Sequence, residues 1–140
     1  MNLTSTDTLM ENILKIKPTR DTPAVYFDPN KGIFKMFGRS LPENSLKFWT
    51  PILRQVENGI ITRHLDVRIK MEYYNTSSSK CVFDLFRVFK AIEDKGIALM
   101  IRWYYDEYDE DMLEAGEDYK NLLNLPIKFI EEKYNRLRSA

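Results

Sequence analysis

Hydrophobic and polar residues alternate without interruption from His64 to Tyr73. The residues on one side of that alternation are Leu65, Val67, Ile69, Met71 and Tyr73. A period of two residues is typical of a β-strand with one buried face. In residues 76–94 the period changes, because apolar residues recur there at helical spacing, which predicts a helix with one buried side. Those residues are Cys81, Leu85, Val88, Phe89 and Ile92.

The N-terminal part of the chain contains the signals of a β-hairpin. Residues 24–28 and 32–38 are rich in Val, Ile, Phe and Tyr and are joined by Pro29-Asn30-Lys31. Pro and Asn are turn residues, so we predict two strands joined by a tight turn. A shorter apolar alternation at residues 13–17, ended by Pro18, predicts an edge strand.

A helix is predicted to follow the hairpin. From Ser40 to Ser45 a hydroxyl, a proline and an acid precede apolar residues at helical spacing that continue to about Asn58. These are typical signals of a helix start. Pro51 lies inside the pattern and removes one backbone donor, so we expect a kink or a late restart near Lys47.

Strands and helices alternate in the rest of the chain. The pattern predicts a strand at 97–105, a helix at 109–123 and a last short strand at 126–131. Repeated strand-helix-strand units imply right-handed crossovers and a mostly parallel sheet. We therefore predict an α/β fold, a single domain with an N-terminal β-hairpin followed by alternating helices and strands. The domain is assigned to residues 13–132, between a flexible N-terminal segment, 1–12, and a charged C-terminal tail, 133–140.

The polar side of strand 64–73 indicates that one face of the sheet has no helical cover, because strands between two helix layers usually lack a polar face. We expect the helices on one face and a partly open second face. Residue parity places on that second face Arg68, Lys70, Ala98, Met100, Arg102 and Tyr104. Mixed aromatic and arginine surfaces are common at protein interfaces. The alternative is that the N-terminal segment or an oligomer partner covers this face.

Composition and charge exclude several function classes. A chain of 140 residues with 44% apolar content is long enough for one buried core and too short for two. Lys plus Arg and Asp plus Glu both number 21, so no overall field attracts nucleic acid or anionic lipid. No apolar run approaches the length of a membrane span, and Met1 to Glu11 lacks the order of an export signal. We expect a cytoplasmic protein with no nucleic-acid or membrane partner.

Candidate catalytic chemistry is sparse. Cys81 is the lone cysteine and lies on the apolar side of its helix, and His64 is the lone histidine. The acidic run at 106–118 could hold Mg²⁺, but its spacing matches no calcium loop and acids are favoured at a helix start. We predict no catalytic site, no metal, no cofactor and no small-molecule substrate. A metal-dependent enzyme built on the acidic run remains an alternative.

The turn between the strand at 64–73 and the helix at 76–94 carries an unusual concentration of polar side chains. They are Asn75, Thr76, Ser77, Ser78, Ser79 and Lys80. The first N–H groups of a helix lack internal partners and favour an anion, so a phosphate could be held here. The simpler interpretation is that Asn75 or Thr76 caps the helix. One cap requires one residue, however, so the excess of hydroxyls keeps the phosphate hypothesis open.

Three motifs together resemble a bacterial family of small regulatory phosphoproteins, the SiaC type, whose fold is like that of STAS domains. The first is Gly-x-Ser-x-Pro-Glu-Asn-Ser, present as residues 38–45, and the second is Tyr-x-Asn-Thr-Ser-Ser, present as residues 73–78. The third is Trp-x-Tyr-Asp at 103–106, followed by acids and a Gly-Glu-Asp-aromatic run at 116–119. The resemblance covers roughly residues 23 to 130, and the shared order and spacing make it specific.

The resemblance implies that Thr76 is a reversible phosphorylation site, served by a dedicated kinase with a histidine-kinase-like ATP fold and a PP2C-type phosphatase. It further implies that the unphosphorylated protein binds and activates a diguanylate cyclase, which raises cyclic di-GMP and favours biofilm formation or aggregation. The alternative within this resemblance is an anti-sigma-factor antagonist in a partner-switching system. The Asp-Ser-Ser-Gly turn typical of sporulation-type antagonists is absent, which favours the cyclase.

We expect the partner surface to surround Thr76. The contacts that we predict are Val82, Phe86, Pro42, Glu43 and Asn44. For Val82 and Phe86 the alternative is packing against a neighbouring helix, because aromatic stripes are usually part of a core.

Overall fold

The strands of this protein form one six-stranded sheet in which spatial order follows chain order. The computed structural model describes residues 12–133. The strands are β1 (Leu14–Ile16), β2 (Ala24–Asp28), β3 (Ile33–Ser40), β4 (His64–Tyr74), β5 (Ala98–Asp106) and β6 (Ile127–Glu132). The helices are α2 (Ser45–Asn58), α3 (Thr76–Asp94) and α4 (Glu110–Leu123). The predicted elements are confirmed. Of the predicted terminal segments 1–12 and 133–140, all but Asn12 and Lys133 lie outside the described residues.

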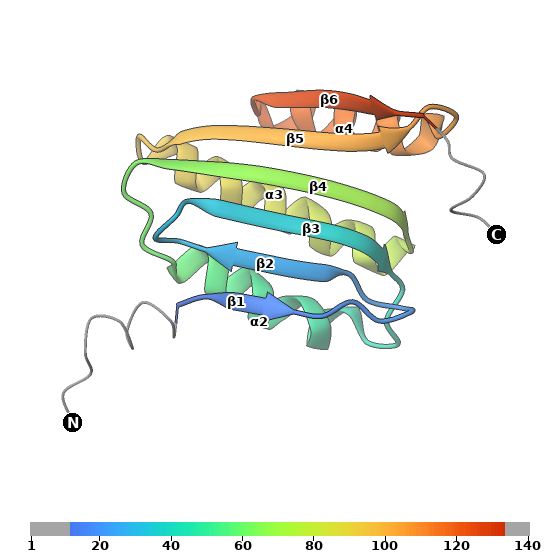
Figure 1. Cartoon of the computed structure of the whole chain (residues 1–140), viewed down its shortest axis with the longest axis horizontal. Coiled ribbons are helices and arrows are strands. Elements are labelled where there is room, and N and C mark those ends of the chain that lie inside the picture. Colours follow the sequence, from blue (N-terminus) through green and yellow to red (C-terminus); the bar gives the residue numbers. More distant parts are fainter. Residues whose placement is uncertain (1–11, 134–140) are drawn as a thin grey trace.

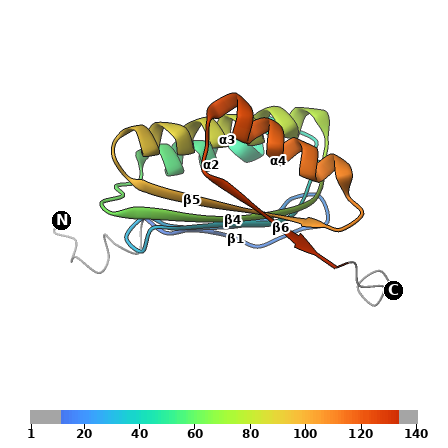
Figure 2. The ribbon, with the colours of Figure 1, turned by 90° about the horizontal axis from the view of Figure 1, so that it is seen from above.

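The sheet combines an antiparallel start with a parallel remainder. Strands β1 to β3 pair antiparallel, and β3 to β6 pair parallel, in the order β1-β2-β3-β4-β5-β6. Each of the three helices therefore connects a strand to the adjacent parallel strand, and all three connections advance in the direction from β3 to β6. Crossovers of one hand that advance in one direction put their helices on the same face. Figure 2 shows all three helices above the sheet, and Figure 1 looks onto the face without helices. The expected α/β fold with one open face is confirmed.

The core lies between the sheet and the helix layer. Its largest fully buried side chains are Trp49, Trp103, Phe27, Phe34, Phe86 and Phe89. The ring of Phe86 lies 4.7 Å from that of Tyr119 and 5.7 Å from that of Trp103, so α3 and α4 share one aromatic cluster over β5. Cys81 is buried as expected. Burial raises the pKa of its thiol, the negative charge of Asp84 raises that pKa further, and the positive charge of Lys80 lowers it.

Helix α2 differs from its prediction at its start. It begins at Ser45 and continues through Pro51, so the expected late restart near Lys47 is wrong. Pro51 is exposed, and the carbonyl group of Lys47, which loses its helical partner, can bond to water. The cap is Asn44, whose side chain accepts a hydrogen bond from the Lys47 N–H. Ser40 instead ends β3 and is buried.

A β-bulge changes which way the end of β4 faces. Gly38 pairs with Met71 but Arg39 pairs with Tyr73, so β4 contains one extra residue at this point. An extra residue inverts the alternation beyond it. Tyr73 is consequently 50% exposed, whereas the Tyr74 hydroxyl lies 2.9 Å from the Tyr119 hydroxyl of α4. The expectation that Tyr73 shares the buried side of the strand is therefore wrong.

The Gly-Glu-Asp-aromatic motif has a packing explanation. A Cβ atom added to Gly116 would lie 2.8 Å from ring atoms of both Trp103 and Phe129. Glycine is thus what allows α4 to approach β5 and β6 closely. The Trp103 ring is fixed, because its Nε1–H donates to the Met112 carbonyl at 2.9 Å.

We predict that Gly116→Ala lowers the free energy of unfolding by about 1–3 kcal/mol, because the overpacking strain exceeds the gain in helix propensity. Urea denaturation measures this. Glu117→Ala on the exposed side of the same helix is the control and should change stability by less than about 0.5 kcal/mol. A Gly116→Ala protein as stable as the original would contradict the packing explanation.

The Tyr74–Tyr119 pair predicts a loss of stability in alkali. Burial is the largest cause that raises the pKa of both phenols. Tyr119 raises the pKa of Tyr74 further, whereas the hydrogen bond with Tyr74 partly offsets the rise in the pKa of Tyr119. The unfolded chain releases these protons near the ordinary pKa of 10.0, so above that pH it binds fewer protons than the folded form. Their stabilisation is complete below about pH 10 and is lost as the pH rises further.

Tyr74→Phe should therefore make the alkaline decline in the free energy of unfolding shallower. At neutral pH it should cost about 1 kcal/mol for the lost hydrogen bond. Denaturation at a series of pH values measures both effects, and the exposed neighbour Tyr73→Phe serves as the control. Equal alkaline slopes in the original protein and in Tyr74→Phe would disprove the assignment.

Candidate functional site

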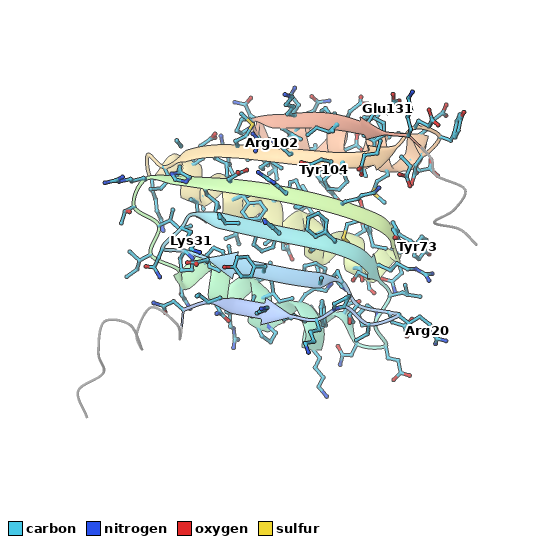
Figure 3. The ribbon with its side chains drawn as sticks, viewed as in Figure 1. Arg20, Lys31, Tyr73, Arg102, Tyr104 and Glu131 are labelled. Carbon is cyan, nitrogen blue, oxygen red and sulfur yellow. The ribbon has the colours of Figure 1, made fainter. Side chains whose placement is uncertain are left out.

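The polar turn lies at the edge of the sheet where three helices begin. Strands β3, β4 and β5 run parallel, so their carboxyl ends share one edge, and α2, α3 and α4 start from it (Figure 1). This edge is where open α/β sheets usually bind ligands. Tyr73, labelled at the end of β4, marks the position of the turn in Figure 3.

Two asparagines cap the two helices that meet here. The Asn75 side chain accepts from the Ser78 N–H at 2.9 Å, and the Asn44 side chain accepts from the Lys47 N–H at 3.1 Å. The capping interpretation of the turn is therefore confirmed, with Asn75 rather than Thr76 as the cap. Asn44 and its neighbour Glu43 are also exposed, and Pro42 is half-buried.

A chain of hydrogen-bonded hydroxyls joins these helix starts to the sheet. Trp49 Nε1–H donates to Ser40 Oγ at 3.1 Å, and Ser40 Oγ donates to Ser78 Oγ at 2.8 Å. Ser45 Oγ lies 3.4 Å from Ser78 Oγ and 2.7 Å from Ser77 Oγ. We call Ser40, Ser45, Ser77 and Ser78 the serine chain. It connects the end of β3 to the first residues of α2 and α3.

The direction of each bond in the serine chain follows from the number of hydrogens. Ser77 donates its only hydroxyl hydrogen to Asn75 Oδ1 at 3.2 Å, so it must accept from Ser45. Ser45 has then used its own hydrogen and accepts from Ser78. Each of the four hydroxyls in the serine chain donates one hydrogen bond, so none of these polar groups is left unsatisfied next to the core.

Thr76 differs from the three serines that follow it. Ser77 and Ser78 belong to the serine chain, Ser78 is fully buried, and Ser79 is half-buried beside Tyr119. Thr76 is exposed, and its hydroxyl makes no hydrogen bond to another residue in the part of the chain that the structure describes. Lys80, one helical turn further on, is exposed as well. A change at the Thr76 hydroxyl would therefore break no hydrogen bond among the described residues.

The Gly-x-Ser-x-Pro-Glu-Asn-Ser motif is explained by the same geometry. Gly38 has a φ of 127°, which favours glycine, and stands where the bulge shifts the register. Ser40 and Ser45 belong to the serine chain, and Asn44 caps α2. These residues were identified by the family resemblance, but the sequence pattern did not predict that Ser40 and Ser45 lie near the turn that contains Thr76. The missing information was the register of β3 against β4, which places Ser40 beside Tyr74.

Two of the predicted partner contacts are buried. Val82 and Phe86 have no exposed surface and belong to the core, so neither side chain is available to a partner in this structure. Helical periodicity placed them at the margin of the apolar side of α3. That margin is covered because α3 lies between α2 and α4 (Figure 2), and Phe86 packs on Tyr119 of α4. The alternative, packing against a neighbouring helix, is the one that holds.

Exposed apolar side chains at this edge were missed by the sequence analysis. Leu46 in the first turn of α2 is 68% exposed, and Tyr108 between β5 and α4 is 80% exposed. Leu46 follows Ser45, whose hydroxyl contacts Ser77, so it lies next to the start of α3. Together with Tyr73, these side chains provide the apolar surface that a protein interface needs.

The acidic run and the other candidate metal ligands do not gather at one position in the described residues. Among residues 12–133, no three His, Cys, Asp or Glu side chains converge on a position that could hold a metal ion. In the acidic run, Asp109 caps α4, and Glu110 and Asp111 lie in its first turn, where the helix dipole favours acids.

A depression of about 370 Å³ between α2 and α3 is lined by side chains such as Leu53, Val88 and Ala91. Within residues 12–133, the helices lack the length and apolar content that spanning a bilayer requires.

We predict that Ser78→Ala lowers the free energy of unfolding by about 1–3 kcal/mol, because it leaves the buried Ser40 hydroxyl without its acceptor. Thr76→Ala removes a hydroxyl from the same turn but breaks no bond, so its effect should stay within about 0.5 kcal/mol. Chemical denaturation of the two variants measures the difference. Similar losses in both would show that the serine chain contributes nothing specific.

Comparison with known proteins identifies the family to which this chain is similar. A family model described as SiaC family regulatory phosphoprotein matches residues 16–132. An uncharacterized protein of Pseudomonas aeruginosa (strain UCBPP-PA14) is 30% identical over 116 residues, which cover 81% of this chain and 92% of that protein. The three motifs therefore identified the family correctly.

Solved structures show the same fold. Apo-SiaC from Pseudomonas aeruginosa has a TM-score of 0.73 at 28% identity, with 84% of this chain and 98% of that chain covered. A structure of diguanylate cyclase SiaD in complex with its activator SiaC, from the same organism, matches with a TM-score of 0.75 at 28% identity and covers 85% of this chain and 99% of that chain. The chain described here belongs to the SiaC family of regulatory phosphoproteins.

Proposed function

We propose that this protein is a non-catalytic signalling adaptor that binds and activates a diguanylate cyclase and is released when Thr76 is phosphorylated. The unphosphorylated form would raise cyclic di-GMP and favour biofilm formation or aggregation. The family is one of regulatory phosphoproteins, and a similar SiaC activates the diguanylate cyclase with which it was solved.

One observation carries the choice of Thr76. It is the first residue of α3, exposed and without a side-chain hydrogen bond among the described residues, whereas Ser77 and Ser78 are bonded in the serine chain and Ser79 is half-buried. Phosphorylation of Ser77 or Ser78 would remove a hydrogen from the serine chain. Phosphorylation of Thr76 leaves that chain intact.

The free protein should tolerate the phosphate. A phosphothreonine carries about −1.5 to −2 charges at neutral pH, and the positive end of a helix dipole favours an anion. The N–H groups of Thr76 and Ser77 point out of the helix start, because Asn75 satisfies those of Ser78 and Ser79. Lys80, four residues further along α3, adds a nearby cation. The fold is therefore expected to survive modification.

A bound partner should not tolerate it. The apolar side chains Leu46 and Tyr73 flank the turn, so an interface that buries them also surrounds Thr76. A phosphate at that position must lose its water, and an unpaired buried charge costs several kcal/mol. Each 1.4 kcal/mol corresponds to about a tenfold loss of affinity, so the modification is sufficient to dissociate a micromolar complex.

Reversible control needs two further partners, a kinase with a histidine-kinase-like ATP fold and a PP2C-type phosphatase. The exposure of Thr76 at a helix start supports access by both. The Asn75 side-chain oxygen is occupied by the cap, so its amide NH2 group is the part of that side chain left for recognition. An anti-sigma-factor antagonist would use the same switch, but the solved complex of a similar SiaC contains a cyclase.

We predict that Thr76→Asp weakens binding to the cognate diguanylate cyclase at least about tenfold, since a charge must be buried. Thr76→Ala should bind like the original protein and stimulate cyclic di-GMP synthesis. Calorimetry with the purified diguanylate cyclases of the source organism measures affinity, and product formation measures activation. Thermal unfolding should show that Thr76→Asp remains folded.

Thr62→Asp is the matched control. Thr62 is exposed in the loop before β4, at the opposite edge of the sheet, and receives the same charge. It should leave binding unchanged. Mass spectrometry of protein from its native cells should find phosphate on Thr76. Equal affinity of the Thr76→Asp and Thr62→Asp variants for the cyclase would refute the proposal, as would phosphate confined to the serines.

A further inference from the structure

Basic side chains form a straight row across the open face of the sheet. The register aligns Lys15 with Tyr26, Tyr26 with Lys35, Lys35 with Arg68, Arg68 with Arg102, and Arg102 with Lys128. We call Lys15, Lys35, Arg68, Arg102 and Lys128 the cationic row. One member comes from each strand except β2, and at about 4.8 Å per strand the row spans about 24 Å. Arg102 is labelled on this face in Figure 3.

Most of the charge in the cationic row is not neutralised by residues 12–133, the part of the chain that the structure describes. Arg102 and Arg68 share a single carboxylate, that of Asp66, at 2.7 Å and 3.6 Å. Lys15, Lys35 and Lys128 form no ion pair with any residue between 12 and 133. The cationic row therefore keeps an excess of positive charge although the whole chain is neutral, with 21 basic and 21 acidic residues.

A second row, apolar except for Lys70, lies beside the cationic row. The register aligns Phe37 with Lys70, Lys70 with Tyr104, and Tyr104 with Ile130. Phe37 is 41% exposed, and Met100, on the other side of the cationic row, is 42% exposed. A depression of about 250 Å³ lies between the two rows, and its walls are formed by Phe37, Arg68, Tyr104 and the paired Lys70 and Glu132. This combination of Arg, Met and aromatic residues is enriched in protein interfaces.

Two other occupants fit this face less well. A second copy placed face to face would bring one cationic row against another, and like charges oppose that contact. A nucleic-acid strand carries a negative charge on every nucleotide and offers no side chain that matches the exposed Phe37 and Met100. Lys70 already pairs with Asp106 and Glu132 at 3.0 Å and 2.7 Å, so this lysine is not free to bind a phosphate.

We propose that the open sheet face is a second docking surface, which takes an acidic and apolar segment of a protein partner. Its carboxylates would contact the free lysines of the cationic row, and an apolar side chain would enter the depression beside Phe37 and Tyr104. The surface is separate from the phosphorylation site, because Arg68 precedes Tyr74 by six residues, or about 20 Å of strand. Occupation of this face therefore does not depend on the state of Thr76.

The test uses a labelled peptide of about eight residues, the length that crosses the six strands when extended. The peptide alternates Glu with Leu and contains one Phe. NMR titration of the full chain should shift the Met100 methyl signal, and added salt should weaken binding. Exchanging Lys15, Lys35 and Lys128 together for Glu should weaken binding about tenfold, since each exposed pair contributes modestly. The same three positions exchanged for Gln give a milder variant if the first does not fold.

The matched control places three Glu residues on the helix layer, at Lys47, Arg54 and Lys95, all exposed. This variant should bind the peptide like the original protein, and so should Thr76→Asp. The proposal is overturned if Met100 does not shift, or if both triple variants lose binding equally. Tighter binding of an oligouridine of similar length would overturn it in favour of nucleic acid. None of these results depends on the cyclase, so they are independent of the Thr76 proposal.

Discussion

The buried serine chain is the constraint on which the arrangement of the candidate site depends. Ser40 comes from a strand end, Ser45 from the start of α2, and Ser77 and Ser78 from the start of α3. Hydroxyls next to a core are stable only when each finds a partner, so these three segments must meet at fixed distances. Within residues 12–133, Thr76 is outside this network and its hydroxyl bonds to no other residue.

Much of this fold could be predicted from the order of apolar and polar residues. The change of period at residue 75 located a strand end and a helix start correctly. Parity failed where it met a bulge, because one extra residue turned Tyr73 outward and Tyr74 toward α4. The helical period of α3 did not reveal that Val82 and Phe86 are buried, because a periodic pattern describes one helix alone. It cannot show that neighbouring helices cover the borders of the apolar side of that helix.

The two candidate surfaces differ in how visible they are in the sequence. The turn at Thr76 is a continuous segment, so its hydroxyls are apparent at once, although their bonding is not. The cationic row takes one residue from each of five strands, and only the register brings these residues into line. The equal numbers of acids and bases conceal this, since acids gather on α4 while basic groups gather on the open face.

The sequential order of the strands has a consequence for how the chain folds. Each strand pairs with the one that precedes it in the chain, so no strand has to insert between two that are already paired. The β2–β3 hairpin needs only local contacts, and every later step adds one helix and one strand to an existing edge. The sheet can therefore assemble in the order in which the ribosome releases it, with one exposed growing edge at any time.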